Sequence, residues 1–190
     1  MRKFVLVAAL ITLAWIFLVP SCSSEFDCEA AGAIAHADDD ECPSDVTEAA
    51  GDAEWAADRF ATIADRKLTA GLFYDSKGSR HRVKSGKDSA ADRANELLRE
   101  LGRLPPGASA FTADHVEVKI AARMRDEDVE SGVLVINHPG GPCAVVDGEP
   151  QPMSCQAFVP VLLPEGARLT VWWPQSGGSM ASFTFTGGAA

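Results

Sequence analysis

The stretch DHVEVKIAARMR at residues 114–125 sets the expected fold, because it predicts a helix shortly before a buried strand. Asp114 is a common type of N-cap residue, so the helix is expected to start there, with His115 and Glu117 in its first turn. The apolar run VLVI at 133–136 follows, and such a run is typical of a strand buried on both faces. A helix that leads into a buried strand indicates an α/β domain.

Elements of the same kinds flank this stretch on both sides. A β-hairpin is expected around the turn DSKG at 75–78, where a glycine is available for positive φ. An amphipathic helix over 88–101 follows, and Gly102 ends it. Further along, the sequence predicts a helix at 154–163, a strand at 169–173 and a weaker strand at 182–186. The expected fold is a three-layer α/β/α domain with a mixed central sheet.

Residues 1–22 are expected to be an export signal outside the fold. Arg2 and Lys3 precede an apolar run of 16 residues from Phe4 to Val19, which is shorter than the roughly 20 residues of a membrane-spanning helix. The run leads into Val-Pro-Ser-Cys, which resembles a bacterial lipobox with Cys22 as the lipidated residue. An ordinary cleaved secretion signal and an uncleaved anchor are the alternatives. All three predict export, and the expected form is a membrane-anchored lipoprotein or a secreted protein.

Residues 23–66 are expected to form an acidic tether. They hold 13 Asp and Glu against 2 Lys and Arg, whereas residues 67–190 hold 14 against 13. A segment this acidic buries little apolar surface and stays solvated. Cys28 and Cys42 lie within it, and in an exported protein they are expected to form a disulfide. The domain is therefore expected at residues 67–190, where a nearly neutral charge neither excludes nucleic acid nor supplies a basic footprint for it.

Four residues of the domain form the candidate site. His115 and Glu117 stand two positions apart, and Cys143, which follows a proline, is separated from Cys155 by 11 residues. One imidazole and two thiolates give zinc three ligands and leave a fourth position open for water. Glu117 is then free to carry protons between that water and a base, as in zinc nucleobase deaminases. The alternative is a Cys143–Cys155 disulfide, which would need neither His115 nor Glu117.

Four further stretches extend this likeness over the whole expected domain. They are GLFYDS at 71–76, ARMR at 122–125, NHP at 137–139 before PC at 142–143, and LLPEGARLTV at 162–171. With the His-x-Glu pair, they resemble the DddA-like bacterial toxin deaminases, a polymorphic-toxin clade of the cytidine deaminase superfamily. The resemblance runs from about Thr69 to Pro174. This chain differs from that clade in the longer segment between its two cysteines.

The resemblance implies a zinc-dependent hydrolase that converts cytosine in DNA to uracil and acts as an exported toxin. His115, Cys143 and Cys155 would bind Zn²⁺. Glu117 would take a proton from the activated water and pass it to the base and the leaving amine. A toxin of this type also implies a DNA substrate and a cognate immunity protein that covers the active site. A lipid anchor at Cys22 would add the membrane as a partner.

Other residues are expected around the base pocket. Asn137 and His138 would line it, and Trp172 would either stack on a nucleotide or pack as an edge-strand core residue. Basic residues on and after the hairpin form either a solvated face or a phosphate-contacting patch, and they are Arg80, Arg82, Lys84 and Lys87. Two other functions stay open at this point: a deaminase of free nucleosides or RNA, and a non-catalytic exported binding module.

Overall fold

The computed structural model describes residues 43–143, 145–146 and 149–188. Its helices are α1 (Val46–Gly51), α2 (Ala53–Ala61), α3 (Ser89–Glu100), the 3₁₀ helix η2 (Phe111–Asp114), α4 (Val116–Asp126) and α5 (Cys155–Leu162). Its strands are β1 (Ala70–Asp75), β2 (Arg80–Lys84), β3 (Ser131–Ile136), β4 (Val145–Val146), β5 (Glu149–Pro150), β6 (Arg168–Pro174) and β7 (Met180–Thr186). The expected export signal, Cys22, Cys28 and Cys42 lie outside the described residues.

Five strands form one mixed sheet in the order β2-β1-β3-β6-β7, as expected. The strand β1 runs antiparallel to both β2 and β3, β3 runs parallel to β6, and β6 runs antiparallel to β7. The parallel β3–β6 pair requires a crossover, and α5 supplies it. Gly78, at the turn of the β1–β2 hairpin, has a φ of 76°. This positive φ confirms the glycine-dependent turn.

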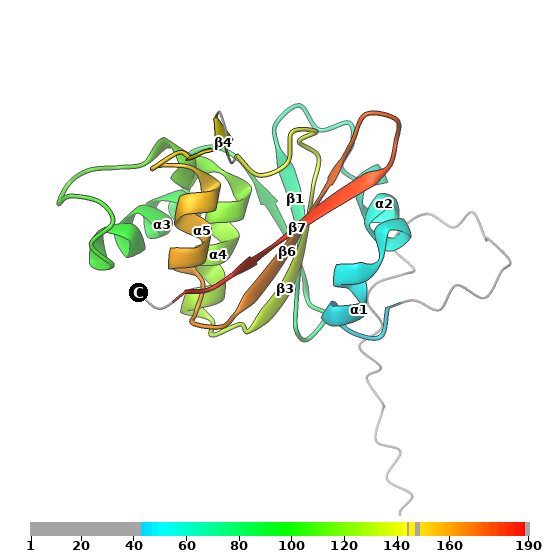
Figure 1. Ribbon diagram of the computed structural model, residues 1–190, viewed down its shortest axis with the longest axis horizontal. Coiled ribbons are helices and arrows are strands. Elements are labelled where there is room, and N and C mark those ends of the chain that lie inside the picture. Colours follow the sequence, from blue (N-terminus) through cyan, green and yellow to red (C-terminus); the bar gives the residue numbers. More distant parts are fainter. Residues whose placement is uncertain (1–42, 144, 147–148, 189–190) are drawn as a thin grey trace, which may run out of the picture.

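The sheet lies between two helical layers, so the three-layer arrangement is confirmed (Figure 1). Side chains alternate between the two faces of each strand. Phe73 and Leu134 point to the layer of α3, α4 and α5, whereas Leu72 and Val135 point to the layer of α1 and α2. Within the described part of the chain, no helix is both long and apolar enough to cross a membrane.

The predicted domain boundary after residue 66 is wrong, because the second helical layer is built from residues assigned to the tether. Asp45 and Asp52 cap α1 and α2 by accepting hydrogen bonds from backbone N–H groups of the first turns. Trp55 and Ile63 are buried against the sheet together with Val46. The acidic residues occupy the caps and the solvent side, while a few apolar residues supply the packing. The assignment of these two short amphipathic helices to the tether, which was based on charge content alone, was therefore wrong.

The start of the central helix also differs from the expectation. Asp114 does not cap it but ends η2, and His115 is the N-cap residue of α4 without a side-chain cap hydrogen bond. The imidazole is therefore available for other contacts. The neighbouring α3 begins as predicted, because Asp88 accepts a hydrogen bond from the N–H of Ala91.

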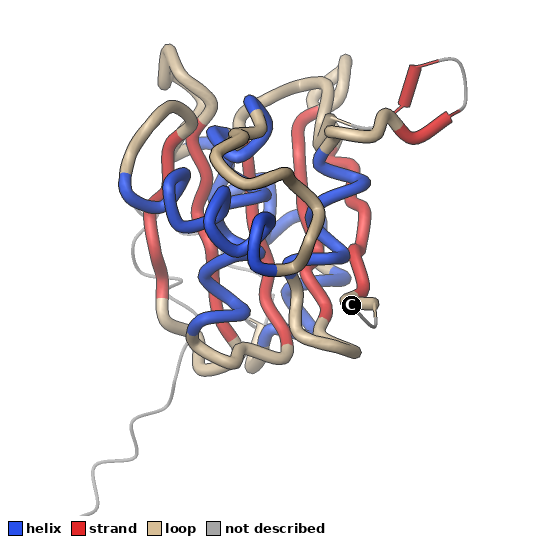
Figure 2. Tube along the Cα trace, turned by 90° about the vertical axis from the view of Figure 1, so that its left-hand side faces the viewer, coloured by secondary structure: helices blue, strands red, loops and turns tan. Residues whose placement is uncertain are grey.

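The segment between Cys143 and α5 carries a small hairpin of its own. Strands β4 and β5 pair antiparallel, and they project away from the body of the domain (Figure 2). The described strands β4 and β5 thus lie between Cys143 and α5, which begins at Cys155. The predicted start of that helix is confirmed, since Ser154 is its N-cap.

Candidate metal centre and active site

The starts of α4 and α5 bring three potential metal ligands together. His115 is the N-cap residue of α4, Cys155 is the first residue of α5, and Cys143 lies in the loop after β3. Their ligand atoms all lie within 4.8 Å of one another. Residues that are 40 positions apart in the sequence converge here because α4 and α5 pack side by side in one layer.

The first turn of α5 stabilises a thiolate on Cys143. Its Sγ lies 2.8 Å from the Sγ of Cys155 and accepts a hydrogen bond of 3.0 Å from the backbone N–H of Cys155. The Cys155 thiol, this N–H and the nearby His115 lower the pKa of Cys143 to about 4. The hydrogen bond with Cys143 and burial raise the pKa of Cys155. Neither cysteine is in a disulfide, so the structure does not support that alternative.

The imidazole of His115 completes the cluster. Its Nδ1 lies 3.3 Å from the Sγ of Cys155. The hydrogen bond with Cys143 raises the pKa of His115, although burial acts in the opposite direction. The positive imidazolium and the Cys143 thiolate stabilise each other. The same nitrogen and sulfur atoms are the ones that would bind a metal.

Glu117 lies in the first turn of α4 and is only 3% exposed. Burial disfavours the carboxylate and raises its pKa to about 7. A hydrogen bond from the backbone of Glu117 and the charge of His115 lower this pKa, but burial outweighs them. A carboxyl group with a pKa near neutrality can both accept and donate a proton, which is what general acid–base catalysis requires.

The donor set fits zinc better than the other common protein metals. One imidazole nitrogen and two thiol sulfurs match the ligands that Zn²⁺ prefers, whereas Mg²⁺ and Ca²⁺ prefer oxygen. Three protein ligands leave one coordination position for water, as in catalytic zinc sites. Glu117 belongs to the same cavity without being part of the ligand cluster. The fit is thus to a catalytic arrangement rather than to a closed structural one.

A cavity of about 250 Å³ opens onto this cluster. Its lining residues come from four separate segments and include Thr69, Ser85, His138 and Gly141 beside His115, Glu117 and Cys143. The volume is below the roughly 300–1,000 Å³ that is typical of sites for drug-sized ligands. A site of this size suits a single small ring. The structure thus places His138 at the cavity, where the sequence had predicted it.

Asn137 does not line the cavity, because its side chain is occupied elsewhere. Its Oδ1 accepts a hydrogen bond of 2.8 Å from the Ala70 N–H. Its Nδ2 donates to the carbonyl oxygens of Ile63, Arg66 and Leu68. Asn137 therefore fastens the segment between α2 and β1 to the end of β3, and its role here is structural.

Trp172 does not face the site either. Its side chain is 6% exposed and packs in the core beneath α1 and α2, where its Nε1 donates to the Ala49 carbonyl at 3.3 Å. The next residue, Trp173, points to the other face because side chains alternate along β6. A Cβ on Gly141 would lie 2.6 Å from the Trp173 ring. Trp173 thus packs directly against the loop that carries Cys143.

Phe111 lies beside the candidate ligand His115 and was not singled out from the sequence. It is 68% exposed, and its ring centroid lies 6.1 Å from that of His115 in an edge-to-face arrangement. The ring is therefore exposed beside one of the candidate metal ligands. In the sequence, Phe111 is only an apolar residue four positions before His115. Nothing in the sequence distinguishes it from a core residue.

The comparisons with known proteins agree with this geometry. A sequence model of the SCP1.201-like deaminase family matches residues 39–189. The match begins before α1, so it covers both helical layers and the whole sheet. A search of curated proteins found no match. The family match supports deamination as the activity of the domain.

Proposed function

We propose that this chain, which belongs to the SCP1.201-like deaminase family, is a zinc-dependent enzyme that converts cytosine to uracil in DNA. The observation that carries the proposal is the convergence of His115, Cys143 and Cys155 on a cavity that also holds the buried Glu117. A closed structural zinc site has four protein ligands and needs no buried carboxyl group beside it. The arrangement therefore favours catalysis over a purely structural role.

The residues present can perform each proton transfer of the reaction. His115, Cys143 and Cys155 would hold the zinc, which lowers the pKa of a bound water to about 7 and makes it a nucleophile. Glu117 would accept a proton from the attacking water, because it is the carboxyl group among the residues that line the cavity. It would pass this proton to N3 of cytosine as the water oxygen bonds to C4. It would then take the second proton of that oxygen and pass it to the amine, so that the C4–N4 bond breaks, ammonia departs and uracil remains.

The test is uracil formation by the purified full chain, with the zinc content measured on the same sample. We expect about one zinc per chain and conversion of cytosine in single- or double-stranded DNA. In Glu117→Gln the zinc should stay, while the rate should fall by about 10²–10⁴-fold. In Cys155→Ser both the zinc and the activity should be lost.

The outcomes separate the proposal from its rivals. Conversion of free cytidine or RNA, with none of DNA, would contradict the DNA substrate and leave a deaminase of another class. Full zinc content with equal, negligible rates for the wild type and Glu117→Gln on every substrate would contradict catalysis and favour a binding module. Absence of zinc in the wild type would contradict the metal centre itself.

We also propose that the protein is an exported bacterial toxin, as its resemblance to DddA-like deaminases implies. Cys22 would then be the lipidated residue of the mature protein, and the producing cell would contain an immunity protein that covers the cavity at Glu117. Mass analysis of the N-terminus of the exported protein tests the first point. Replacement of Cys22 by Ala should release the protein from membranes, and an unchanged membrane fraction would contradict lipid anchoring.

A further inference from the structure

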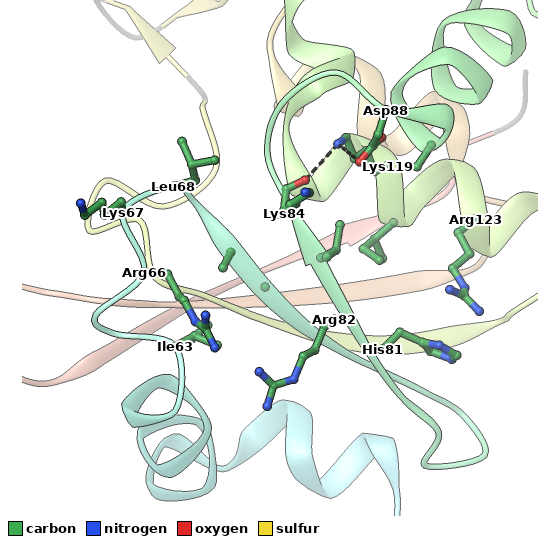
Figure 3. Close-up of a pocket in the computed structure, with 15 residues that line it drawn as sticks. Ile63, Arg66, Lys67, Leu68, His81, Arg82, Lys84, Asp88, Lys119 and Arg123 are labelled. Atoms are coloured by element: carbon green, nitrogen blue, oxygen red, sulfur yellow. Dashed lines mark hydrogen bonds and ion pairs between the residues drawn. The ribbon is translucent and has the colours of Figure 1, made fainter.

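A second and larger cavity, of about 620 Å³, lies along the edge strand β2. We call it the β2 groove. It is lined by the apolar residues Ile63 and Leu68 among others, and its basic residues come from three segments. Lys119 and Arg123 of α4 belong to one of them. Arg66 and Lys67 lie between α2 and β1, and Arg82 and Lys84 lie on β2 (Figure 3). None of these residues belongs to the cluster at Glu117.

The β2 groove exists because the helical layer does not cover the whole sheet. Helices α1 and α2 contact β3, β6 and β7. On the same face, Arg82 lies opposite Leu72 of β1 and Lys84 lies opposite Ala70. Strand β2 thus extends beyond the helices, and its side chains on that face are charged.

Two of the six basic residues that line the β2 groove, Lys119 and Arg123, pair with Asp88 and Glu127, whereas the other four lack acidic partners within the described part of the chain. No carboxylate there lies within ion-pair distance of Arg66, Lys67, Arg82 or Lys84. Asp88 is the one carboxylate among the lining residues, and it already pairs with Lys119 at 2.9 Å. The whole chain carries a net charge of −10. A gathering of unpaired cations on an acidic protein indicates that the groove receives an anion.

The β2 groove adjoins the catalytic cavity. Leu68, Ala70 and Lys84 line the groove, whereas their sequence neighbours Thr69 and Ser85 line the cavity at Glu117. The Ser85 N–H donates to the Thr69 carbonyl at 2.8 Å and so joins the two segments at the boundary. A ligand in the cavity that continues past this boundary would enter the groove. The part of the ligand in the groove would contact the basic side chains and the side chain of Leu68, which is 62% exposed.

We infer that the β2 groove binds the sugar–phosphate backbone of a polynucleotide whose target base occupies the cavity at Glu117. Phosphates would contact the arginines and lysines, and the sugars and bases would lie on the apolar surface. The inference rests on the proposed function, since it needs a base in the cavity. It deepens that function by making the substrate a strand rather than a free nucleoside. Of the basic cluster expected from the sequence, Arg82 and Lys84 line the groove, whereas Arg80 and Lys87 do not.

The test uses binding of fluorescein-labelled oligo-dT, which contains no cytosine, to the full chain at several salt concentrations. The variant is Arg82→Gln/Lys84→Gln, and a second pair is Arg66→Gln/Lys67→Gln. The control is Lys77→Gln/Arg103→Gln, because both residues are exposed, carry no ion pair among the described residues and do not line the groove. All three variants change the net charge by the same amount. Long-range electrostatics alone would therefore affect them equally.

We expect the slope of log affinity against log salt to fall by about 0.7 for each phosphate that a groove variant no longer neutralises, and to stay unchanged in the control. The zinc content should not change in the groove variants, because none of their residues belongs to the metal cluster. Equal oligo-dT binding by groove and control variants would overturn the inference and leave the proposed function standing. Tighter binding of polyglutamate than of oligo-dT would also overturn it, in favour of an acidic protein partner. Groove-dependent oligo-dT binding without uracil from any substrate would support the groove and contradict the proposed function.

Discussion

The backbone N–H of Cys155 donates a hydrogen bond of 3.0 Å to the Sγ of Cys143. The first residue of α5 therefore contacts another ligand of the candidate metal centre. The position of this helix therefore fixes two ligands at once: it carries one and stabilises the thiolate of the other. Ser154 holds the first turn by accepting a hydrogen bond of 3.2 Å from the Ala157 N–H. The capping of α5 and the affinity for metal are thus linked.

Replacement of Ser154 by Ala should weaken both properties. Loss of an N-cap of this kind costs about 1 kcal/mol of stability, and fraying of the first turn would move the Cys155 N–H away from Cys143. Urea unfolding and competition with a zinc chelator measure the two effects. Ser154→Thr keeps the hydroxyl group and should behave like the wild type. If Ser154→Ala lost stability but kept its zinc affinity, the linkage between the cap and the metal centre would be wrong.

Removal of zinc should abolish deamination and lower the melting temperature. Stabilisation by a ligand of the folded state grows with its concentration relative to Kd, and it is about 2.7 kcal/mol at 100 times Kd. Dialysis against a chelator followed by calorimetry measures the change. Zinc should restore activity and stability, whereas Mg²⁺ should restore neither, because the cluster offers nitrogen and sulfur ligands. Equal activity before and after complete metal removal would contradict the metal-dependent mechanism.

Most of the domain fold was predictable from local patterns in the sequence. The VLVI run gave a buried strand, and the apolar spacing of residues 88–101 gave α3. The segment of α1 and α2 was assigned to the tether, although helix was expected over residues 48–65, because residues 23–66 are strongly acidic. The few apolar side chains that matter, such as Trp55 and Ile63, are buried only in the presence of the sheet. Charge counting thus overlooked contacts that exist only in the tertiary structure.

Some residues of the candidate site were likewise predictable from the sequence, and others were not. The ligand set could be predicted because the chemistry of zinc restricts residue types and because His115 and Glu117 are close in sequence. The residues that line the cavity could not be predicted. The face of the sheet to which a side chain points depends on the register of its strand. A shift of one residue exchanges Trp172 with Trp173 between the two faces of the sheet. Asn137 was misjudged because its four partners lie 67 to 74 residues away.

The ion pair between Lys119 and Asp88 should make stability depend on pH. Lys119 is 2% exposed, and its Nζ donates to the Lys84 and Gly86 carbonyls as well as to Asp88. Burial raises the pKa of Asp88, but hydrogen bonds from Lys119 and from the Ala91 N–H outweigh it and lower the pKa below 3.8. The stabilisation is therefore present above pH 3.8 and is lost as the pH falls through the pKa of the folded state.

Urea unfolding of the wild type and Asp88→Asn between pH 7 and pH 3 measures this dependence. The variant should be less stable at pH 7, and the difference should shrink towards pH 3, because the wild-type carboxylate becomes protonated. In a Lys119→Met background, the difference should be small at every pH, since the partner is absent. A difference between wild type and Asp88→Asn that stayed constant over this range would show that the charge of Asp88 contributes nothing.

Phe111 should contribute to the binding of polynucleotide rather than to stability. Stacking of a base on an aromatic side chain is worth about 1–3 kcal/mol, so Phe111→Ala should lower kcat/KM on an oligonucleotide by about 5- to 150-fold. Its 68% exposure predicts little change in melting temperature. Phe111→Trp should retain activity, because the indole ring also stacks.

Phe183→Ala is the matched control, since this phenylalanine is 44% exposed on β7, at the other edge of the sheet from β2. It should leave kcat/KM unchanged. Zinc content must be measured in every variant, because the Phe111 ring lies beside the ligand His115. A Phe111→Ala protein that retains zinc and acts on the oligonucleotide as fast as the wild type would show that the exposed ring has no part in substrate binding.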